Sequence, residues 1–216
     1  MIGDDWEVPP PQFFFGAMSP YSWFAAERVE QLLPEARWRG VFAGAIFKAN
    51  GRSSWGLGEK RAEGMAECEA RAAAHGLGSI RWPVPWPTND LLVARAMTYA
   101  GRLREPMPAA IGDGHEDGGL LRPFALAAMR LAFREGADLG DIEAVLEAGH
   151  RAGLDRQELR EALADQEIKH ALREATDAAL AIGVFGVPSV AVGGVLYWGD
   201  DRLQDAAAAY RSGTAL

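Results

Sequence analysis

The segment 19–22, Ser-Pro-Tyr-Ser, has residue types that could begin a helix and hold an anion at its end. It follows an apolar run at 13–15, which is typical of a short buried strand. Serine is favoured at a helix N-cap, and proline fits the next position because no backbone N–H is needed there. The unpaired N–H groups and the positive end of the helix dipole would stabilise an anion beside Ser19.

The chemistry open to Ser19 depends on the nature of that anion. A sulfur bound there would have a lowered thiol pKa, so its nucleophilic thiolate would be populated near neutral pH. No Ser-His-Asp pattern surrounds Ser19, which argues against acyl transfer by the serine itself. The alternative is that the serine and proline only start a helix, which is the commoner role of such a pair.

Val187 and Pro188 form a second candidate, directly before a predicted strand. Proline cannot donate to a sheet ladder, so it belongs at the start or edge of a strand. A cis bond here would turn the backbone of Val187 towards a ligand, although trans is the usual state of such bonds.

Acidic and basic side chains supply two more candidates. Asp200 and Asp201 follow Trp198 and Gly199 at a strand–helix junction, where a carboxylate could cap the last helix or bind a ligand ammonium. Lys48 follows the second predicted strand and could meet a substrate carboxylate, or it could be an ordinary solvated lysine.

The N-terminal part of the chain predicts a strand–helix–strand unit. A strand at 13–15, a helix from Pro20 to about Leu33 and a strand at 38–42 would place two strands in parallel. The stretch 43–58 is rich in Gly, Ser and Asn, and we predict a loop there.

A long helical region follows, from about 59 to 181, because its apolar residues recur at helix spacing. Alternate prolines at 81–89 exclude a helix and predict an extended segment between helices. The glycine-rich, acidic stretch 105–119 predicts a mobile surface loop. Two strands, 189–192 and 195–198, then flank a Gly-Gly turn, and a helix at about 201–210 ends the pattern.

Composition limits the classes of partner. A net charge of −8 argues against nucleic-acid binding, and no apolar run approaches the ~18 residues of a membrane helix. The acidic N-terminal stretch lacks the features of a signal peptide, which favours a cytoplasmic protein. The single cysteine, Cys68, cannot form an intramolecular disulfide, and Glu67 and Glu69 beside it would raise its thiol pKa. The four histidines show no metal-binding spacing, so we predict no metal site.

Six segments, in order along the chain, carry a resemblance to a known family. They are Phe-Phe-Gly-Ala-Met-Ser-Pro-Tyr-Ser-Trp at 14–23, Gly-Ala-Ile-Phe-Lys-Ala-Asn-Gly at 44–51, Arg-Trp-Pro at 81–83, Pro-Thr-Asn at 87–89, Gly-Val-Phe-Gly-Val-Pro-Ser at 183–189 and Tyr-Trp-Gly-Asp-Asp-Arg-Leu at 197–203. The chain resembles the 2-hydroxychromene-2-carboxylate isomerases and the kappa-class glutathione transferases, relatives of the DsbA-type oxidoreductases.

The resemblance implies an α/β, thioredoxin-like fold of the DsbA type. Its βαβ…ββα sheet would be formed by a discontinuous domain, 12–58 with 182–216, interrupted by a helical insertion domain at 59–181. It also implies a homodimer that takes a small-molecule substrate.

The resemblance assigns roles to the candidate residues. Ser19 would be the catalytic serine that holds the glutathione thiolate, and Pro188 would be the cis-proline of thioredoxin folds. The backbone of Val187 would pair with the cysteinyl part of glutathione. Its γ-glutamyl end would meet Trp198, Gly199, Asp200 and Asp201, with Asp201 on the ammonium. Lys48, Thr88 and Asn89 would face the second substrate.

The implied reaction is a thiol-assisted isomerisation, in which the glutathione thiolate adds to a conjugated aromatic pyruvate derivative and is later eliminated. A glutathione transferase is the alternative enzyme, and a DsbA-like protein that binds a thiol or peptide without turnover is the alternative outside catalysis. A dithiol oxidoreductase is disfavoured because serines occupy positions 19 and 22, and the remote Cys68 cannot cycle a disulfide alone.

Overall fold

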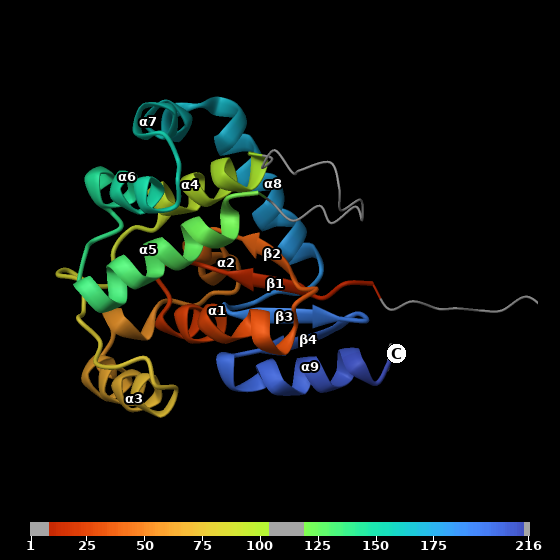
Figure 1. The fold of residues 1–216 in the computed structure, drawn as a ribbon. Helices are drawn as coiled ribbons and strands as arrows, with labels where there is room; N and C mark the ends of the chain where they lie inside the picture. Colours follow the sequence, from red (N-terminus) through yellow and green to blue (C-terminus); the bar gives the residue numbers. More distant parts are fainter. Residues whose placement is uncertain (1–8, 104–118, 214–216) are drawn as a thin grey trace, which may run out of the picture.

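A computed structural model describes residues 9–103 and 119–213 of the chain (Figure 1). Four strands form one sheet in the order β2-β1-β3-β4. The strands are β1 (Gln12–Phe15), β2 (Arg37–Gly40), β3 (Ser189–Val192) and β4 (Val195–Trp198). β1 and β2 are parallel, whereas β3 is antiparallel to both β1 and β4. Segments from the two ends of the chain therefore complete a single sheet, as the sequence predicted.

The aromatic run in β1 supplies both faces of this sheet, because successive strand residues point to opposite sides. Phe13 and Phe15 are fully buried and contact Trp38 of β2 edge-on, with ring centroids 5.1 and 5.3 Å apart. Phe14 belongs to a separate buried cluster on the other face, which includes Ile46 and Ala179. Continuous hydrophobicity of this kind is typical of a strand that is covered on both sides.

Helices cover the two faces of the sheet (Figure 1). α1 (Pro20–Leu32) and α9 (Leu203–Arg211) pack on the face of Phe13 and Phe15. α2 (Ala43–Ala49) and α8 (Gln166–Ala181) pack on the face of Phe14. A short 3-10 turn, η2 (Asp200–Arg202), connects β4 to α9.

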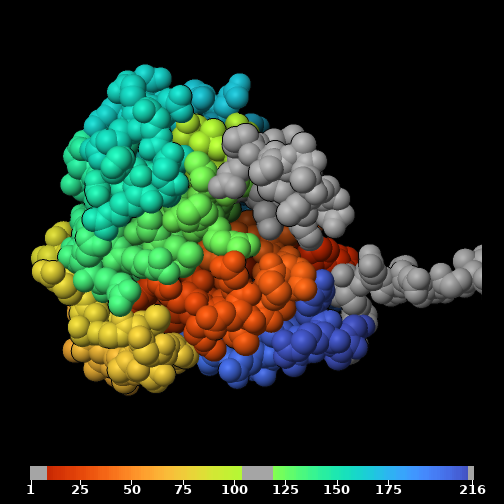
Figure 2. Space-filling view, viewed as in Figure 1, coloured from red at the N-terminus to blue at the C-terminus, as the bar shows by residue number. Residues whose placement is uncertain are grey.

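The predicted helical region lies between β2 and β3 in sequence, and most of it stacks above α1 and the sheet in the view of Figures 1 and 2. Besides α8 it contains α3 (Arg61–Ala74), α4 (Leu91–Arg102), α5 (Leu121–Glu135), α6 (Ile142–Arg151) and α7 (Arg156–Ala164), of which α3 lies below α1 in this view. A short 3-10 turn, η1 (Trp55–Leu57), precedes this region. Most of the region's buried apolar side chains belong to the same cluster as Phe13 and Phe15, so the helical region and the sheet share one core. No helix in the described part of the chain is long and apolar enough to cross a membrane.

The loop predicted at 43–58 is wrong, because α2 and η1 form there. The N-cap position of α2 is Phe42, whose side chain makes no capping hydrogen bond. The carboxylate of Asp90 accepts hydrogen bonds from the backbone of Ala43 and Gly44 instead. Because the capping carboxylate comes from a residue distant in sequence, the local pattern of this stretch did not indicate a helix.

The other connections follow their predicted chemistry. The segment 81–89 contains no helix or strand, and Gly193 and Gly194 turn the last hairpin with φ of 54° and 84°. Positive φ at both positions is what a two-residue type I′ turn requires. The acidic loop expected at 105–119 lies outside the described residues apart from Gly119.

Candidate functional site

One edge of the sheet gathers the loops that carry the predicted site residues. β1 ends there before the loop to Ser19, and β3 begins there after Pro188. Phe14 pairs with Ser189, and Ser189 pairs with Trp198 at the end of β4. The backbone N–H of Gly199 donates to the carbonyl of Pro188 at 3.0 Å. The pairing register therefore brings the loop before α1, the Val187–Pro188 bond and the start of η2 to the same edge.

Ser19 is the N-cap of α1, as predicted. Its Oγ accepts a hydrogen bond from the backbone N–H of Ser22 at 3.2 Å, and its side chain is partly buried. Ser22 is fully buried, and its Oγ accepts from the N–H of Gly16 at 3.4 Å. Within the described residues, the hydroxyl proton of Ser19 has no acceptor. The capping bond uses a lone pair of Ser19, so its proton can still be donated to an anion.

The bond between Val187 and Pro188 is cis, as the family resemblance implied. In the part of the chain that the structure describes, neither the N–H nor the carbonyl of Val187 makes a hydrogen bond. The residue is nevertheless only 5% exposed. Buried backbone groups without partners are rare in folded proteins, and a ligand that supplies one donor and one acceptor would satisfy both.

Gly16 keeps the loop before α1 close to this backbone. A methyl group added at Gly16 would lie 2.9 Å from the Cβ of Ala43 and 3.6 Å from a methyl carbon of Val187. The first distance is shorter than ordinary van der Waals contact. A glycine is therefore needed for the start of α2, the cis-proline loop and the loop to Ser19 to meet.

The junction after β4 separates the two predicted carboxylates. Asp201 is exposed, and no described cation forms an ion pair with it. Trp198 is 43% exposed, and its indole covers Gly186 just before Val187. Gly199 adopts a φ of 113°, a conformation that favours glycine. Asp201 thus keeps a free carboxylate at the site edge, where it could meet a ligand ammonium.

Asp200 instead points into the protein and is 1% exposed. Its carboxylate accepts from Arg71 at 2.6 Å and lies 3.4 Å from Nε2 of His75 and 3.9 Å from Arg28. Neither η2 nor α9 has a side-chain cap, so the capping role considered for Asp200 and Asp201 is not observed. The carboxylate of Asp200 holds η2 against α1 and α3.

The three residues predicted to face a second substrate are placed differently from one another. Lys48 is exposed near the end of α2, and no described residue pairs with it. Thr88 donates its hydroxyl to Asp138 at 2.7 Å. The Oδ1 of Asn89 accepts from the N–H of Leu91 at 2.9 Å, at the start of α4. Lys48 is free to contact a ligand, whereas Thr88 and Asn89 already have intramolecular partners.

Trp86, in the extended segment 81–89, contacts the site, although it was not among the residues predicted from the sequence. Trp86 is buried, and its Nε1 donates to the carbonyl of Met18, next to Ser19, at 3.3 Å. Its ring contacts Trp82 and Trp55 at centroid distances of 4.6 and 4.9 Å. The pair of tryptophans among alternate prolines was the available signal, but sequence alone could not say which loop they cover.

Asp90 is a second residue that the sequence did not single out. Burial raises the pKa of its carboxyl from 3.8 to about 6, although the N–H groups of Ala43 and Gly44 oppose the shift. Asp90 directly follows segment 81–89. Because α2 begins at the site edge, the carboxylate of Asp90 fixes one wall of the site. An aspartate directly before a helix normally indicates the N-cap of that helix. The sequence therefore did not indicate that Asp90 contacts the backbone of α2.

The inert character predicted for Cys68 is confirmed. The residue is fully buried, and burial raises the pKa of its thiol to about 12, with a smaller contribution from Glu67. The sequence argument named the neighbouring charges, whereas loss of hydration is the larger cause. A thiol of this kind supplies no nucleophile near neutral pH.

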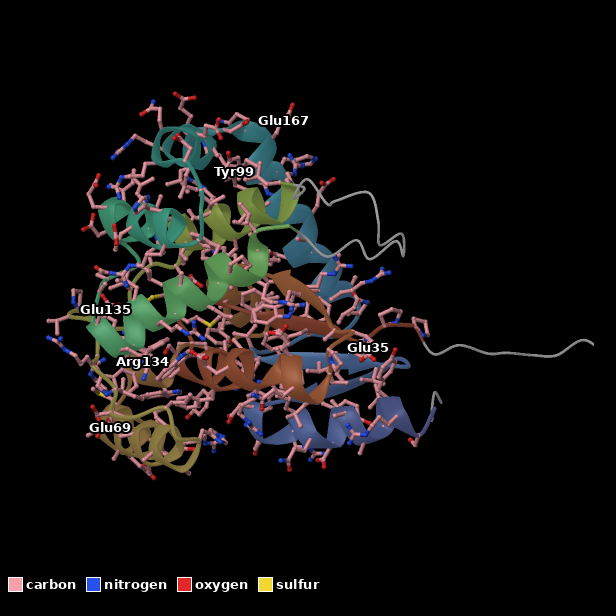
Figure 3. The ribbon with its side chains drawn as sticks, viewed as in Figure 1. Glu35, Glu69, Tyr99, Arg134, Glu135 and Glu167 are labelled. Carbon is pink, nitrogen blue, oxygen red and sulfur yellow. The ribbon has the colours of Figure 1, made fainter. Side chains whose placement is uncertain are left out.

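A cavity of about 590 Å³ lies elsewhere, on the outer side of α5. Its lining is Pro123, Leu126, Ala127, Arg130, Arg134, Glu135 and Arg151. Arg130 forms a two-bond ion pair with Glu27, and Arg151 pairs with Glu135. Arg134 and Glu135 sit at the end of α5 (Figure 3). The cavity includes none of the predicted site residues, and two of its arginines are neutralised, so we do not assign the chemistry there.

Comparison with known proteins agrees with this architecture. The model of the DSBA-like thioredoxin domain matches residues 12–211. The chain therefore belongs to the DSBA-like thioredoxin domain family. No curated protein sequence matches it.

Solved structures share the fold at low sequence identity. A 2-hydroxychromene-2-carboxylate isomerase matches with a TM-score of 0.76, 20% identity and 94% of each chain covered. A probable DsbA oxidoreductase from Streptomyces coelicolor matches with a TM-score of 0.66, 19% identity, and 94% of this chain and 88% of its own covered. The cytosolic disulfide reductase DsbM from Pseudomonas aeruginosa, solved with glutathione, matches with a TM-score of 0.52, 14% identity, and 95% and 99% covered.

Proposed function

We propose that this chain is a glutathione-dependent isomerase acting on a conjugated, aromatic pyruvate-type substrate. The observation that carries the proposal is a serine hydroxyl at the N-terminus of α1, on the same sheet edge as the unpaired backbone of Val187. Serine in this position cannot form a disulfide but can donate to a sulfur anion. The likeness to an isomerase supports the choice of reaction, and the likeness to a structure solved with glutathione supports the choice of ligand.

Two parts of glutathione, the cysteinyl and the γ-glutamyl residue, have partners in this proposal. The N–H and carbonyl of Val187, preceding Pro188, pair with the cysteinyl residue. The exposed carboxylate of Asp201 takes the γ-glutamyl ammonium, beside Trp198 and Gly199. Asp200 contributes by fixing the junction, because its own carboxylate is buried and paired with Arg71.

The chemistry assigned to the site is reversible addition of the thiolate. Bound glutathione releases its thiol proton to solvent water, and the resulting thiolate forms a carbon–sulfur bond to the conjugated alkene. The electron pair of the double bond moves onto the neighbouring carbonyl, so the former double bond is now single and rotates. The carbonyl electrons then return, the carbon–sulfur bond breaks, and the trans alkene leaves with the thiolate regenerated. Ser19 and the helix end stabilise sulfur as an anion at both ends of this cycle. Lys48, with the segment at Thr88 and Asn89, faces the second substrate.

A kappa-class-like glutathione transferase is the second candidate, because the same thiolate site would serve it. The two reactions differ in the fate of sulfur: the isomerase releases it, whereas the transferase leaves it in the product. Mass analysis of the product separates them. The proposal also includes a cytoplasmic homodimer, which light scattering and cell fractionation would test.

Calorimetric titration with glutathione tests the proposal directly. We expect saturable binding at ligand concentrations up to roughly millimolar, and weaker binding when the γ-glutamyl ammonium is acetylated. Absence of binding by glutathione at these concentrations would exclude the glutathione-dependent enzyme and leave a peptide-binding protein of this fold.

The Ser19→Ala variant tests the role of the hydroxyl. Loss of a hydrogen bond to a charged sulfur should raise the pKa of bound glutathione by about 1 to 2 units, because such a bond contributes about 1.5–3 kcal/mol. Thiolate ultraviolet absorbance as a function of pH gives this value. Ser54→Ala is the matched control, since Ser54 caps η1 by accepting from Gly56 at 3.2 Å. An unchanged thiol pKa in Ser19→Ala would mean that Ser19 only caps a helix.

A further inference from the structure

Arg52 lies beside the proposed thiol site and has no acidic partner among the residues that the structure describes. Its guanidinium carbon lies 4.8 Å from the ring centroid of Trp198 and 5.8 Å from that of Phe185. Nη1 donates to the carbonyl of Phe185 at 3.4 Å. The remaining N–H groups of the exposed guanidinium are open to a ligand.

The two aromatic rings beneath Arg52 are themselves exposed. Phe185 is 37% and Trp198 is 43% exposed, and their centroids are 4.9 Å apart with the rings tilted by 56°. Trp198 lies on Gly186, where an added methyl would come within 2.5 Å of the indole nitrogen. We call Arg52, Phe185 and Trp198 the arginine–aromatic platform. It adjoins Val187, whose backbone groups are unpaired.

The backbone of α2 fixes the arginine in place. Gly51 follows the helix with a φ of 63°, and the N–H of Arg52 donates to the carbonyl of Phe47 at 2.8 Å. The turn therefore aims the side chain across the cis-proline loop. Lys48, exposed on the same short helix, adds a second positive charge to this end of an otherwise acidic protein.

We propose that the arginine–aromatic platform binds the electrophilic substrate by its carboxylate and its aromatic ring. The inference rests on the proposed function, because it assigns binding residues to the substrate proposed for the same site. A guanidinium presents paired N–H donors that match a carboxylate, and its contact with Trp198 and Phe185 holds them in position. The exposed ring surfaces supply apolar contact for a planar ligand. A carboxylate on a conjugated aromatic chain satisfies both features, whereas a neutral analogue satisfies only one.

Binding of two small probes without glutathione tests the platform. The probes are benzylidenepyruvate, a conjugated aromatic 2-oxo acid, and benzylideneacetone, which has a methyl group in place of the carboxylate. Calorimetry should show the acid binding about 3- to 10-fold more tightly than the ketone. Arg52→Gln should abolish this preference, and Arg52→Lys should retain part of it. Arg173→Gln, which removes an exposed arginine of α8, should leave it intact.

An acid affinity that does not change in Arg52→Gln would overturn the assignment. If that variant in addition weakened the binding of glutathione but not of its glycine ethyl ester, the arginine would belong to the carboxylate of glutathione. Ser19→Ala should leave the acid affinity unchanged. Failure of glutathione binding would overturn the proposed function while the platform still binds the acid, so the two failures are distinguishable.

Discussion

At the scale of single residues, the two serines at positions 19 and 22 decide what the first turn of α1 can do. A hydroxyl at position 19 caps the helix and keeps one proton to donate, and a hydroxyl at position 22 is buried against Gly16. Neither can exchange electrons with a disulfide. Because Cys68 is buried with a strongly raised thiol pKa, a reactive sulfur at this site would have to come from a ligand.

The buried carboxyl of Asp90 should make the free energy of unfolding depend on pH. Below pH 3.8 the group is neutral in both the folded and the unfolded chain, and its contribution to stability is complete. As the pH rises through about 6 the folded protein must ionise a buried acid, so about 3 kcal/mol is lost. Asp90→Asn cannot ionise and keeps an acceptor for α2.

Urea denaturation at pH 4 and pH 7.5 measures this effect. The stability of Asp90→Asn relative to the natural protein should rise by about 2–3 kcal/mol between the two values. Asp177→Asn, which removes an exposed carboxylate on α8, serves as the control. A difference that is the same at both pH values would show that Asp90 does not titrate in this range.

At the scale of elements, residues remote in sequence hold the short segments around the site. α2 begins on the carboxylate of Asp90, and its preceding residue, Phe42, donates its N–H to Thr176 of α8 at 3.2 Å. η2 is held by the carboxylate of Asp200, which meets side chains of α1 and α3. Such short helices are marginal alone, so these contacts decide their position.

Asp200→Ala should lower the free energy of unfolding by about 2–4 kcal/mol, because Arg71 and Arg28 would lose a buried counter-charge. Asp205→Ala is the matched control, since its ion pair with Arg202 is more than half exposed on both sides. That control should cost less than about 1 kcal/mol. Equal losses in the two variants would contradict the structural role given to Asp200.

At the scale of the whole molecule, the helical region and the sheet are joined by a continuous core. Trp23 of α1 and Phe133 of α5 are both fully buried and stack with centroids 5.7 Å apart. Trp82, from the extended segment, meets Phe133 edge-on at 6.1 Å. A core shared in this way couples the stability of the two regions, although the sequence presents them as a domain and an insertion.

Phe133→Ala should therefore destabilise both regions together, by about 3–5 kcal/mol. Unfolding followed by far-ultraviolet circular dichroism, which reports mainly the helices, should coincide with unfolding followed by tryptophan fluorescence. Leu126→Ala, at a partly buried position on the same helix, should cost less. Two separate transitions in the natural protein would show that the helical region unfolds alone.

Much of the fold follows from local sequence. Apolar runs and the Gly-Gly turn predicted the strands, and helix periodicity predicted the helical region. Ser19 and Pro20 correctly predicted the start of α1, because capping and proline geometry act within a few residues.

Only the tertiary structure decided which side chains are free at the site. Asp200 and Asp201 are adjacent in sequence, yet one is buried beside Arg71 and the other is exposed. The cap of α2, the contact of Trp86 with the loop before Ser19 and the placement of Arg52 on Trp198 also join residues far apart in the chain. Burial and ion pairing depend on what the whole chain brings together, so a local pattern identifies the groups that could react but not those left available for a ligand.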